Sequence, residues 1–347
     1  MADVIAGRFE LLDVLARGGT GSVWRARDLR TGAVCAAKVL RQRDSVDLLR
    51  FVREKDVTLA HPHVLTPTGW AAEDRHVVIA MPLVAGPTLE ALLSRVGPLS
   101  TPSVALMLDQ LLQALGHVHA HGWVHRDVKP SNLLWEASGA GRPRLRLADF
   151  GIAVRAEDVR FTHAGMVNGT PGYVAPEVFT GAEPAPVQDL YAAGMCALLA
   201  LRPDHVPQDG AIPAPRLDAM LDGVDDQVAV VVRRLLAENP DGRFADATEA
   251  RAALPRPRRR ARLVAADGSE VTIPDLLGGF ASDDGGVGAL RGRTGIAREG
   301  IEDSGEHSET DAEQRLSPAG MALLGVGGIA AVAVGAGSSA GLLTLLG

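Results

Sequence analysis

The sequence predicts an α+β chain of two lobes, a small lobe built mainly of strands with one helix and a large lobe built mainly of helices. Residues 8–40 alternate like strands around a glycine-rich turn. A further apolar run at 76–81 has the length of a strand. Residues 102–120, in contrast, form a long apolar run of helical length that ends before Gly122. Strands therefore gather in the first part of the chain and helices in the second.

Composition excludes several classes of protein. Hydrophobic residues make up 46% of the 347 residues and charged residues 22%, as in ordinary globular chains. The net charge of −7 argues against a nucleic-acid partner, because binding to phosphates needs a basic surface. Cys35 and Cys196 are too few for a disulfide framework or a multi-cysteine zinc site, and they fit a reducing cytosol. Cys35 lies in an apolar strand and is expected in the core.

The chain divides into a folded part and two further segments. We expect the small lobe at about 8–84 and the large lobe at about 85–255, so that the domain covers 8–255. Residues 256–318 lose all periodicity and are rich in polar residues, which predicts a disordered linker. The linker begins with five arginines within 256–262. They fit a solvated domain end or, alternatively, a contact with anionic lipid or an acidic partner.

The last segment, 319–347, predicts a transmembrane helix. Its 29 residues carry no charge, whereas about 20 suffice to cross a bilayer. Its many glycines and alanines leave a buried helix or a flexible tail open. A spanning helix would make this a single-pass protein of the cell membrane, with its folded domain in the cytoplasm. Gly337 and Gly341 would let two such helices pair, so a homodimer is a further expectation.

The glycine-rich turn, Ala16-Arg17-Gly18-Gly19-Thr20-Gly21-Ser22-Val23, stands between two predicted strands. Glycines would let backbone N–H groups approach phosphate oxygens with no Cβ in the way. A plain hairpin turn is the alternative.

A lysine in the following apolar strand is the next candidate. Only three of the 35 basic residues are lysine, and Lys38 is one of them. A compact ammonium suits phosphate oxygens here better than a guanidinium, although a lysine that snorkels from a strand edge is the alternative. Glu54, the only glutamate between Lys38 and Glu73, could hold this cation or be an exposed helix carboxylate.

The decisive string is His125-Arg126-Asp127-Val128-Lys129-Pro130-Ser131-Asn132. Asp127 can accept or orient a hydroxyl proton, and Lys129 can neutralise a transferred phosphoryl group. Asn132 offers a neutral oxygen to a hard metal ion, and Asp149, 17 residues later in Asp149-Phe150-Gly151, could share the same Mg²⁺. A polar loop followed by a helix cap would explain either string alone. Both strings together, after the glycine turn and Lys38, argue against that alternative.

These strings resemble those of protein kinases, and among them the bacterial eukaryotic-like Ser/Thr kinases of the transmembrane type. The resemblance covers about residues 8–255. It implies the two-lobed protein kinase fold, ATP with Mg²⁺ (or Mn²⁺) as cofactors, and protein substrates with Ser or Thr acceptors. Ile152, after Asp149-Phe150-Gly151, resembles the form associated with threonine acceptors. After Asp189 the family's usual T-G-x-x-P-F string is missing, so the docking of protein substrates is expected to differ.

The resemblance also assigns roles to residues. Asp127 and Lys129 would be catalytic, with Asp127 as the base, and Asn132 and Asp149 would hold the metal. Lys38 would bind the α/β-phosphates and pair with Glu54. Met81 would be the gatekeeper before the hinge Pro82-Leu83-Val84, where the family uses the first carbonyl and the third N–H. The full set expected to bind ATP is Ala16, Arg17, Gly18, Gly19, Thr20, Gly21, Val23, Ala36, Lys38, Glu54, Met81, Pro82 and Val84.

Five other residues would have structural or regulatory roles. Residues 169–177 (GTPGYVAPE) match the end of the activation segment, and Arg243 would pair with Glu177. Asp189 resembles the buried helix aspartate that braces the catalytic loop. Arg126 would contact a phosphorylated residue of the activation segment, for which Thr162 is the candidate. The alternative for Thr162 is a solvated loop threonine.

Two other functions are alternatives to that of a protein kinase. A pseudokinase scaffold at the membrane would keep the fold without catalysis, but Lys38, Asp127, Asn132 and Asp149 are all present. A small-molecule phosphotransferase shares the fold but normally lacks a segment like 169–177. His117, His119 and His121 near the end of the apolar helix lack the combination of i, i+4 histidines with a carboxylate that a zinc protease needs, and they are expected to pack there.

Overall fold

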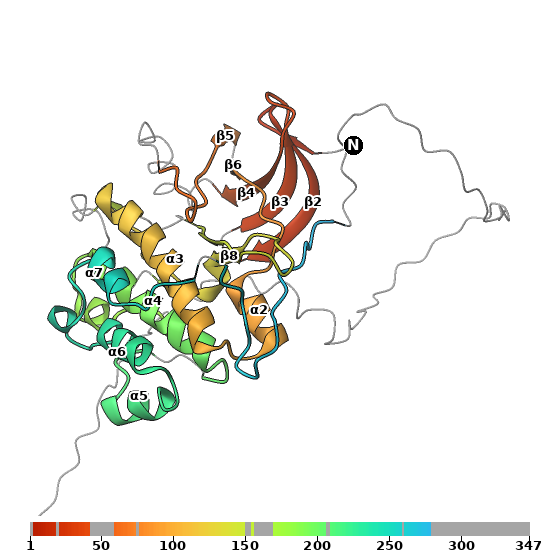
Figure 1. Cartoon of the computed structure of the whole chain (residues 1–347). Coiled ribbons are helices and arrows are strands. Elements are labelled where there is room, and N and C mark those ends of the chain that lie inside the picture. Colours follow the sequence, from red (N-terminus) through yellow and green to blue (C-terminus); the bar gives the residue numbers. More distant parts are fainter. Residues whose placement is uncertain are drawn as a thin grey trace, which may run out of the picture.

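The computed structural model describes residues 3–18, 21–41, 59–73, 76–149, 154–155, 169–205, 209–258 and 260–278. Strands gather in a small lobe and helices in a large one, as the sequence predicts (Figure 1). The predicted helix of the small lobe falls between residues 41 and 59 and lies outside the described residues.

The small lobe is a single antiparallel sheet. Its described strands are β1 (Val4–Ile5), β2 (Phe9–Gly18), β3 (Gly21–Asp28), β4 (Val34–Arg41), β5 (Gly69–Glu73) and β6 (His76–Met81), in the order β1-β2-β3-β4-β6-β5. Along β6, Val78 and Ala80 belong to one apolar cluster, and Val77 and Ile79 belong to another. Since successive strand residues face opposite sides, this sheet buries apolar side chains on both faces.

The large lobe is built around two buried helices. Its helices are α2 (Leu89–Val96), α3 (Thr101–Ala120), α4 (Pro186–Leu201), α5 (Ala214–Met220), α6 (Asp226–Leu235) and α7 (Ala247–Ala252). Helix α3 packs against both α4 and α7, which explains why its sequence is apolar nearly all round. Each fully buried leucine in this core, such as Leu108 or Leu111, stabilises the fold by about 1.5–3 kcal/mol.

Short strands and 3-10 helices make up the rest of the described secondary structure. They are β7 (Trp123–Val124), η2 (Pro130–Asn132), β8 (Leu133–Trp135), β9 (Leu145–Leu147), β10 (Val154–Arg155), η4 (Pro176–Thr180) and η5 (Pro240–Gly242). Strand β8 pairs with β9, and β10 pairs with β7. These small pairings fix the ends of the loops in which the candidate catalytic residues lie.

The folded domain extends beyond the predicted boundary at residue 255. Residues 263–273 form a hairpin against the large lobe, in which Leu263, Ala265, Val271 and Ile273 are each at most 4% exposed. The expectation of a disordered linker is therefore wrong for this part of 256–318. The hairpin was not predicted because its two arms are short, and a short strand gives a weaker hydrophobic pattern in the sequence than a long strand or helix.

The predicted membrane segment cannot be compared with the structure. Residues 279–347 lie outside the described residues. Within the described part of the chain, every helix is too short or too polar to cross a membrane.

Histidines and cysteines have packing positions. The ring of His117, in the last turn of α3, stacks on His61 with centroids 4.9 Å apart and contacts His121 at 4.5 Å. Burial lowers the pKa of His61 to about 4, helped by the neighbouring His117 and His63, so its ring is neutral at pH 7. Cys35 and Cys196 are buried free thiols, as expected for Cys35 in a core strand.

Candidate active site

The catalytic loop between β7 and η2 is fixed by one buried carboxylate. Asp189, in the first turn of α4, is 1% exposed and accepts hydrogen bonds from the N–H groups of His125 and Arg126, both at 2.8 Å. Arg126 has a φ of 68°, a conformation that costs a residue with a side chain free energy. The two bonds to Asp189 hold this strained turn, and the structure places Asp189 where the resemblance expected a brace.

A histidine that the sequence analysis treated as packing supports the same carboxylate. Nε2 of His119, on α3, lies 2.7 Å from Oδ2 of Asp189, so it donates the hydrogen bond. Burial alone would raise the pKa of Asp189, but the hydrogen bond and charge of His119 hold it below its ordinary value. The carboxylate is thus ionised at neutral pH and can accept all three bonds. Local spacing gave no signal for this contact, because the two residues lie 70 positions apart.

His125 joins the catalytic loop to the strand that precedes Asp149. The residue is fully buried, its Nδ1 accepts from the N–H of Asp127 at 3.3 Å, and its Nε2 donates to the carbonyl of Ala148 at 3.1 Å. Burial lowers the pKa of His125, so the neutral ring with its proton on Nε2 fits both bonds. The neutral imidazole therefore fixes the backbone at Asp127 relative to the backbone just before Asp149.

Asp127 lies at the centre of a compact polar cluster. Its Oδ2 is 2.9 Å from Nζ of Lys129 and accepts from Nδ2 of Asn132 at 3.0 Å. Its Oδ1 accepts from the hydroxyl of Thr170 at 2.7 Å, and Thr170 in turn accepts from Nζ of Lys129 at 2.7 Å. Asp127, Lys129 and Asn132 are each at most 8% exposed. The structure therefore brings together three of the predicted site residues.

Thr170 is a site residue that the sequence analysis did not assign. It lies in the predicted activation-segment string, between Gly169 and Pro171, and was noted there only as part of the match. In the structure its hydroxyl links Lys129 to Asp127 across 41 and 43 residues of chain. The sequence signal for this role was a residue with a hydroxyl group at a fixed position in the string 169–177.

Lys38 forms an ion pair with Asp149 across the two lobes. Nζ of Lys38, on β4, is 2.5 Å from Oδ1 of Asp149, which follows β9. Burial would raise the pKa of Asp149, but the charge and hydrogen bond of Lys38 keep it below its ordinary value. Asp149 also has a positive φ, of 66°. The predicted partner of Lys38, Glu54, lies outside the described residues.

The donor set of Asn132 and Asp149 fits a hard cation. Both amide hydrogens of Asn132 are used toward Asp127, one on its carboxylate and one on its carbonyl at 2.8 Å, which leaves Oδ1 as the group for a metal. Asp149 is ionised, as a metal ligand must be. In the described residues no three His, Cys, Asp or Glu side chains converge on one point. Mg²⁺ takes one or two protein oxygens and completes its shell with water and phosphates, so an amide oxygen and a carboxylate are donors of the kind it uses.

The predicted ATP-binding residues of the sheet share one face. Val23 on β3 lies opposite Lys38 on β4, and Ala36 lies opposite Met81 on β6. Because Ala36 and Lys38 are two residues apart on one strand, all four side chains point to the same side. Pro82 is exposed and Val84 half-buried directly after β6.

The glycine-rich turn is a hairpin between β2 and β3, in which Ala16 pairs with Val23, Arg17 with Ser22 and Gly18 with Gly21. A Cβ on Gly21 would come within 2.2 Å of the carbonyl oxygen of Val39. Packing against β4 thus requires this glycine, in addition to any contact with phosphate. Gly19 and Thr20 lie outside the described residues.

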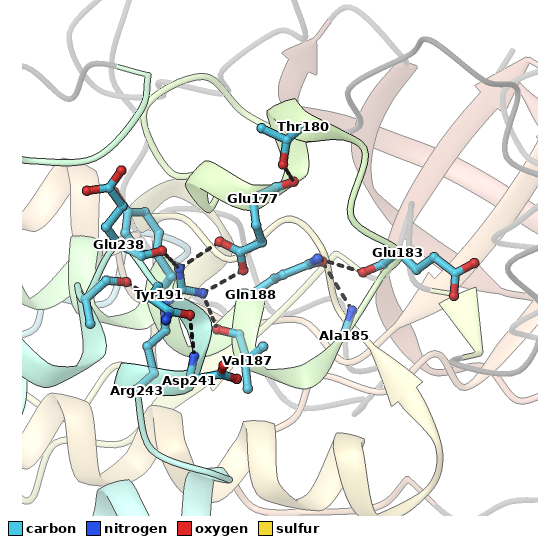
Figure 2. Close-up of polar contacts among 12 residues, drawn as sticks. Glu177, Thr180, Glu183, Ala185, Val187, Gln188, Tyr191, Glu238, Asp241 and Arg243 are labelled. Atoms are coloured by element: carbon cyan, nitrogen blue, oxygen red, sulfur yellow. Dashed lines mark hydrogen bonds and ion pairs between the residues drawn. The ribbon is translucent and has the colours of Figure 1, made fainter.

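The end of the activation segment is anchored by Arg243. Its Nη1 and Nη2 each lie 2.7 Å from one carboxylate oxygen of Glu177 on η4, and its side chain is fully buried (Figure 2). The same guanidinium donates to the carbonyls of Val187 and Glu238 (Figure 2) and to that of Ala237. This two-pronged pair is the one expected from the sequence, and it ties η4 to η5 and to the start of α4.

The loop after α4 contacts the same segment. Oδ1 of Asp209 accepts from the N–H of Gly172 at 2.6 Å. This loop stands where the family's usual string is missing, and its carboxylate contacts the backbone of the segment 169–177. Phe150, Gly151 and Thr162 lie outside the described residues.

The site lies between a β lobe and a helical lobe. It combines the carboxylate of Asp127 beside Lys129, the Lys38–Asp149 pair and the amide oxygen of Asn132. This fold and these groups are those of a phosphotransferase. A sequence model described as the protein kinase domain matches residues 9–243. The chain belongs to the protein kinase family, which confirms the resemblance at that level.

The named relatives are bacterial Ser/Thr protein kinases. Serine/threonine-protein kinase PkaA of Streptomyces coelicolor is 34% identical over 262 residues, or 69% of this chain and 48% of the relative. PknA of Mycobacterium tuberculosis is 35% identical over 283 residues, or 74% of this chain and 64% of the relative. PrkC of Bacillus subtilis is 30% identical over 244 residues, or 69% of this chain and 35% of the relative. The chain thus matches about half the length of these relatives.

Thr170→Ala tests the role of the hydroxyl that joins Lys129 to Asp127. We expect kcat to fall about tenfold to a hundredfold, because both charged groups lose a positioning hydrogen bond. Thr170→Ser keeps the hydroxyl and should retain most of the activity. Steady-state kinetics with a protein substrate measures both, and equal kcat values for the alanine variant and the wild type would contradict the assignment.

Proposed function

We propose that the chain is an ATP- and Mg²⁺-dependent Ser/Thr protein kinase that transfers the γ-phosphoryl group to protein hydroxyls. The observation that carries the proposal is the placement of Asp127, which contacts Lys129, Asn132 and Thr170. The Lys38–Asp149 pair supports it, because a phosphate-binding cation and a metal ligand lie together. Threonine acceptors are favoured in this proposal, on the strength of Ile152 alone.

The chemistry requires one bond to form and one to break. The acceptor oxygen attacks the γ-phosphorus, the bond from that phosphorus to the β–γ bridging oxygen breaks, and ADP leaves with the electron pair. The hydroxyl proton passes to Asp127, whose carboxylate is oriented by Thr170 and Asn132. Lys129 stabilises the negative charge on the transferred group. Asn132 and Asp149 would hold Mg²⁺, which neutralises phosphate charge when bound.

Asp127→Asn tests catalysis in the full chain. With labelled ATP and a protein substrate, we expect phosphate transfer to fall about 100- to 10,000-fold, since the amide cannot accept the proton. Asp246→Asn, at the exposed N-cap of α7, is the matched control and should behave as wild type. If wild type and Asp127→Asn show equal and negligible transfer, the pseudokinase scaffold is the better description.

Autophosphorylation of Thr162 is proposed as the activating step. A phosphate adds a charge of about −1.5 to −2, and Arg126, next to the catalytic base, is the cation that it would contact. Before and after incubation with ATP, the rate of the wild type should rise, whereas Thr162→Ala should not gain activity. Thr248→Ala, at an exposed position of α7, is the control. Activation of Thr162→Ala to the wild-type level would contradict the proposal.

Membrane tethering through 319–347, with the kinase domain in the cytoplasm and the option of a homodimer, is also proposed from the uncharged run. Two arginines, Ile329→Arg with Val332→Arg, should release the chain from the membrane fraction, because each costs about 2.5–3.5 kcal/mol at a helix centre. Leucines at the same positions are the control. Recovery of the wild type in the soluble fraction would contradict tethering.

A further inference from the structure

A segment beyond the family match crosses from the base of the large lobe to the hinge. We call residues 263–276 the strap; it begins 20 residues after Arg243, where the protein kinase match ends. Figure 1 shows it in blue, beside α2 and directed toward the small lobe.

The start of the strap is docked on the beginning of α3. Val264 donates its N–H to Oγ of Ser103 at 2.8 Å, and its carbonyl accepts from the same hydroxyl at 2.9 Å. Ser103 is 1% exposed, and without the strap its hydroxyl would lose both bonds to Val264 and keep the contact with Oγ of Ser100 at 3.0 Å. The N–H of Ala266 also donates to the carbonyl of Pro98 at 2.8 Å.

The second arm of the strap is held beside the hinge. Ile273 is 1% exposed and exchanges two backbone hydrogen bonds of 2.9 Å with Gly139. A Cβ added to Gly86 would lie 2.0 Å from the carbonyl oxygen of Trp135 and 3.1 Å from Ile273. The chain just after the hinge is therefore enclosed between β8 and the strap.

The strap ends on the carbonyl of Ala85, the residue that follows the hinge. The N–H of Leu276 donates to the carbonyl oxygen of Ala85 at 2.7 Å. Ala85 directly follows Val84, the residue whose N–H is expected to bind adenine. The side chain of Leu276 does not carry this contact, because the residue is 40% exposed.

We infer that Leu276 is a positioning residue for the nucleotide: through Ala85, its N–H holds the hinge backbone in the conformation that binds adenine. The inference rests on the proposed kinase function, because it assigns adenine to this hinge. The strap supplies the rigidity, since it is anchored at Ser103 and Gly139 before it reaches Ala85.

This role predicts a change in ATP binding without a change in chemistry. Adenine takes no part in bond breaking, so its contacts act equally on the bound substrate and the transition state. Loss of such a contact raises KM and leaves kcat unchanged. A general loss of structure would lower kcat as well.

Leu276→Pro in the full chain removes the N–H. We expect KM for ATP to rise about two- to tenfold, the range for one hydrogen bond, with kcat within about twofold of wild type. Leu276→Ala keeps the N–H and should match wild type. Leu277→Pro removes an N–H that bonds only to Asp275 within the chain end and should also match wild type. An unchanged KM for Leu276→Pro, or an equal change in Leu277→Pro, would overturn the inference.

A second measurement covers the case in which Leu276→Pro does not fold. In the wild-type chain, hydrogen exchange of a peptide spanning 273–278 should be slow and should slow further with a non-hydrolysable ATP analogue, because coupling between the two contacts is reciprocal. Exchange at the rate of an open chain, or no response to the analogue, would overturn the inference. If the wild type transfers no phosphate, the kinase proposal fails, and equilibrium dissociation constants for ATP in the same variants test the strap separately.

Discussion

The active site depends on the buried carboxylate of Asp189. It accepts from two consecutive main-chain amides and from His119, so it joins α3, α4 and the catalytic loop at one point. Each buried N–H left without a partner would cost about 1–3 kcal/mol. The bonds therefore offset the strained backbone of Arg126, and Asp127 follows directly in the chain. The position of the base is thus determined by a residue 62 positions away that takes no part in the chemistry.

Two lysines then pair with two carboxylates. Lys129 contacts Asp127 within the large lobe, whereas Lys38 contacts Asp149 across the lobes. Backbone strain gathers in the same place, because two of the three residues with a side chain and a positive φ in the described regions are Arg126 and Asp149. Such strain persists only where surrounding contacts fix it, and here it occurs directly before Asp127, the base of the proposed reaction, and at Asp149, the proposed metal ligand.

Local patterns predicted much of this fold and site. Strand β6 and helix α3 have strong apolar patterns, and their bounds agree with the sequence to within one residue. Asp127, Lys129, Asn132 and Asp149 were found because the chemistry requires those side chains in short strings. His119 and Thr170 were missed because their partners lie 70 and about 40 residues away. The strap had a usable signal: Asp267-Gly268, a favoured hairpin turn, between alternating apolar residues on both sides.

The strap changes where this domain ends as an independently stable unit. A fragment cut at the last matched residue, or at 255, would remove both hydrogen bonds between Ser103 and Val264 and expose the apolar surface on which Leu263, Val271 and Ile273 pack. Newly exposed apolar surface of this kind promotes self-association of the fragment and lowers its solubility. A recombinant form of this domain should therefore extend to residue 278. Aggregation of a shorter form would result from the truncation and not from a property of the intact domain.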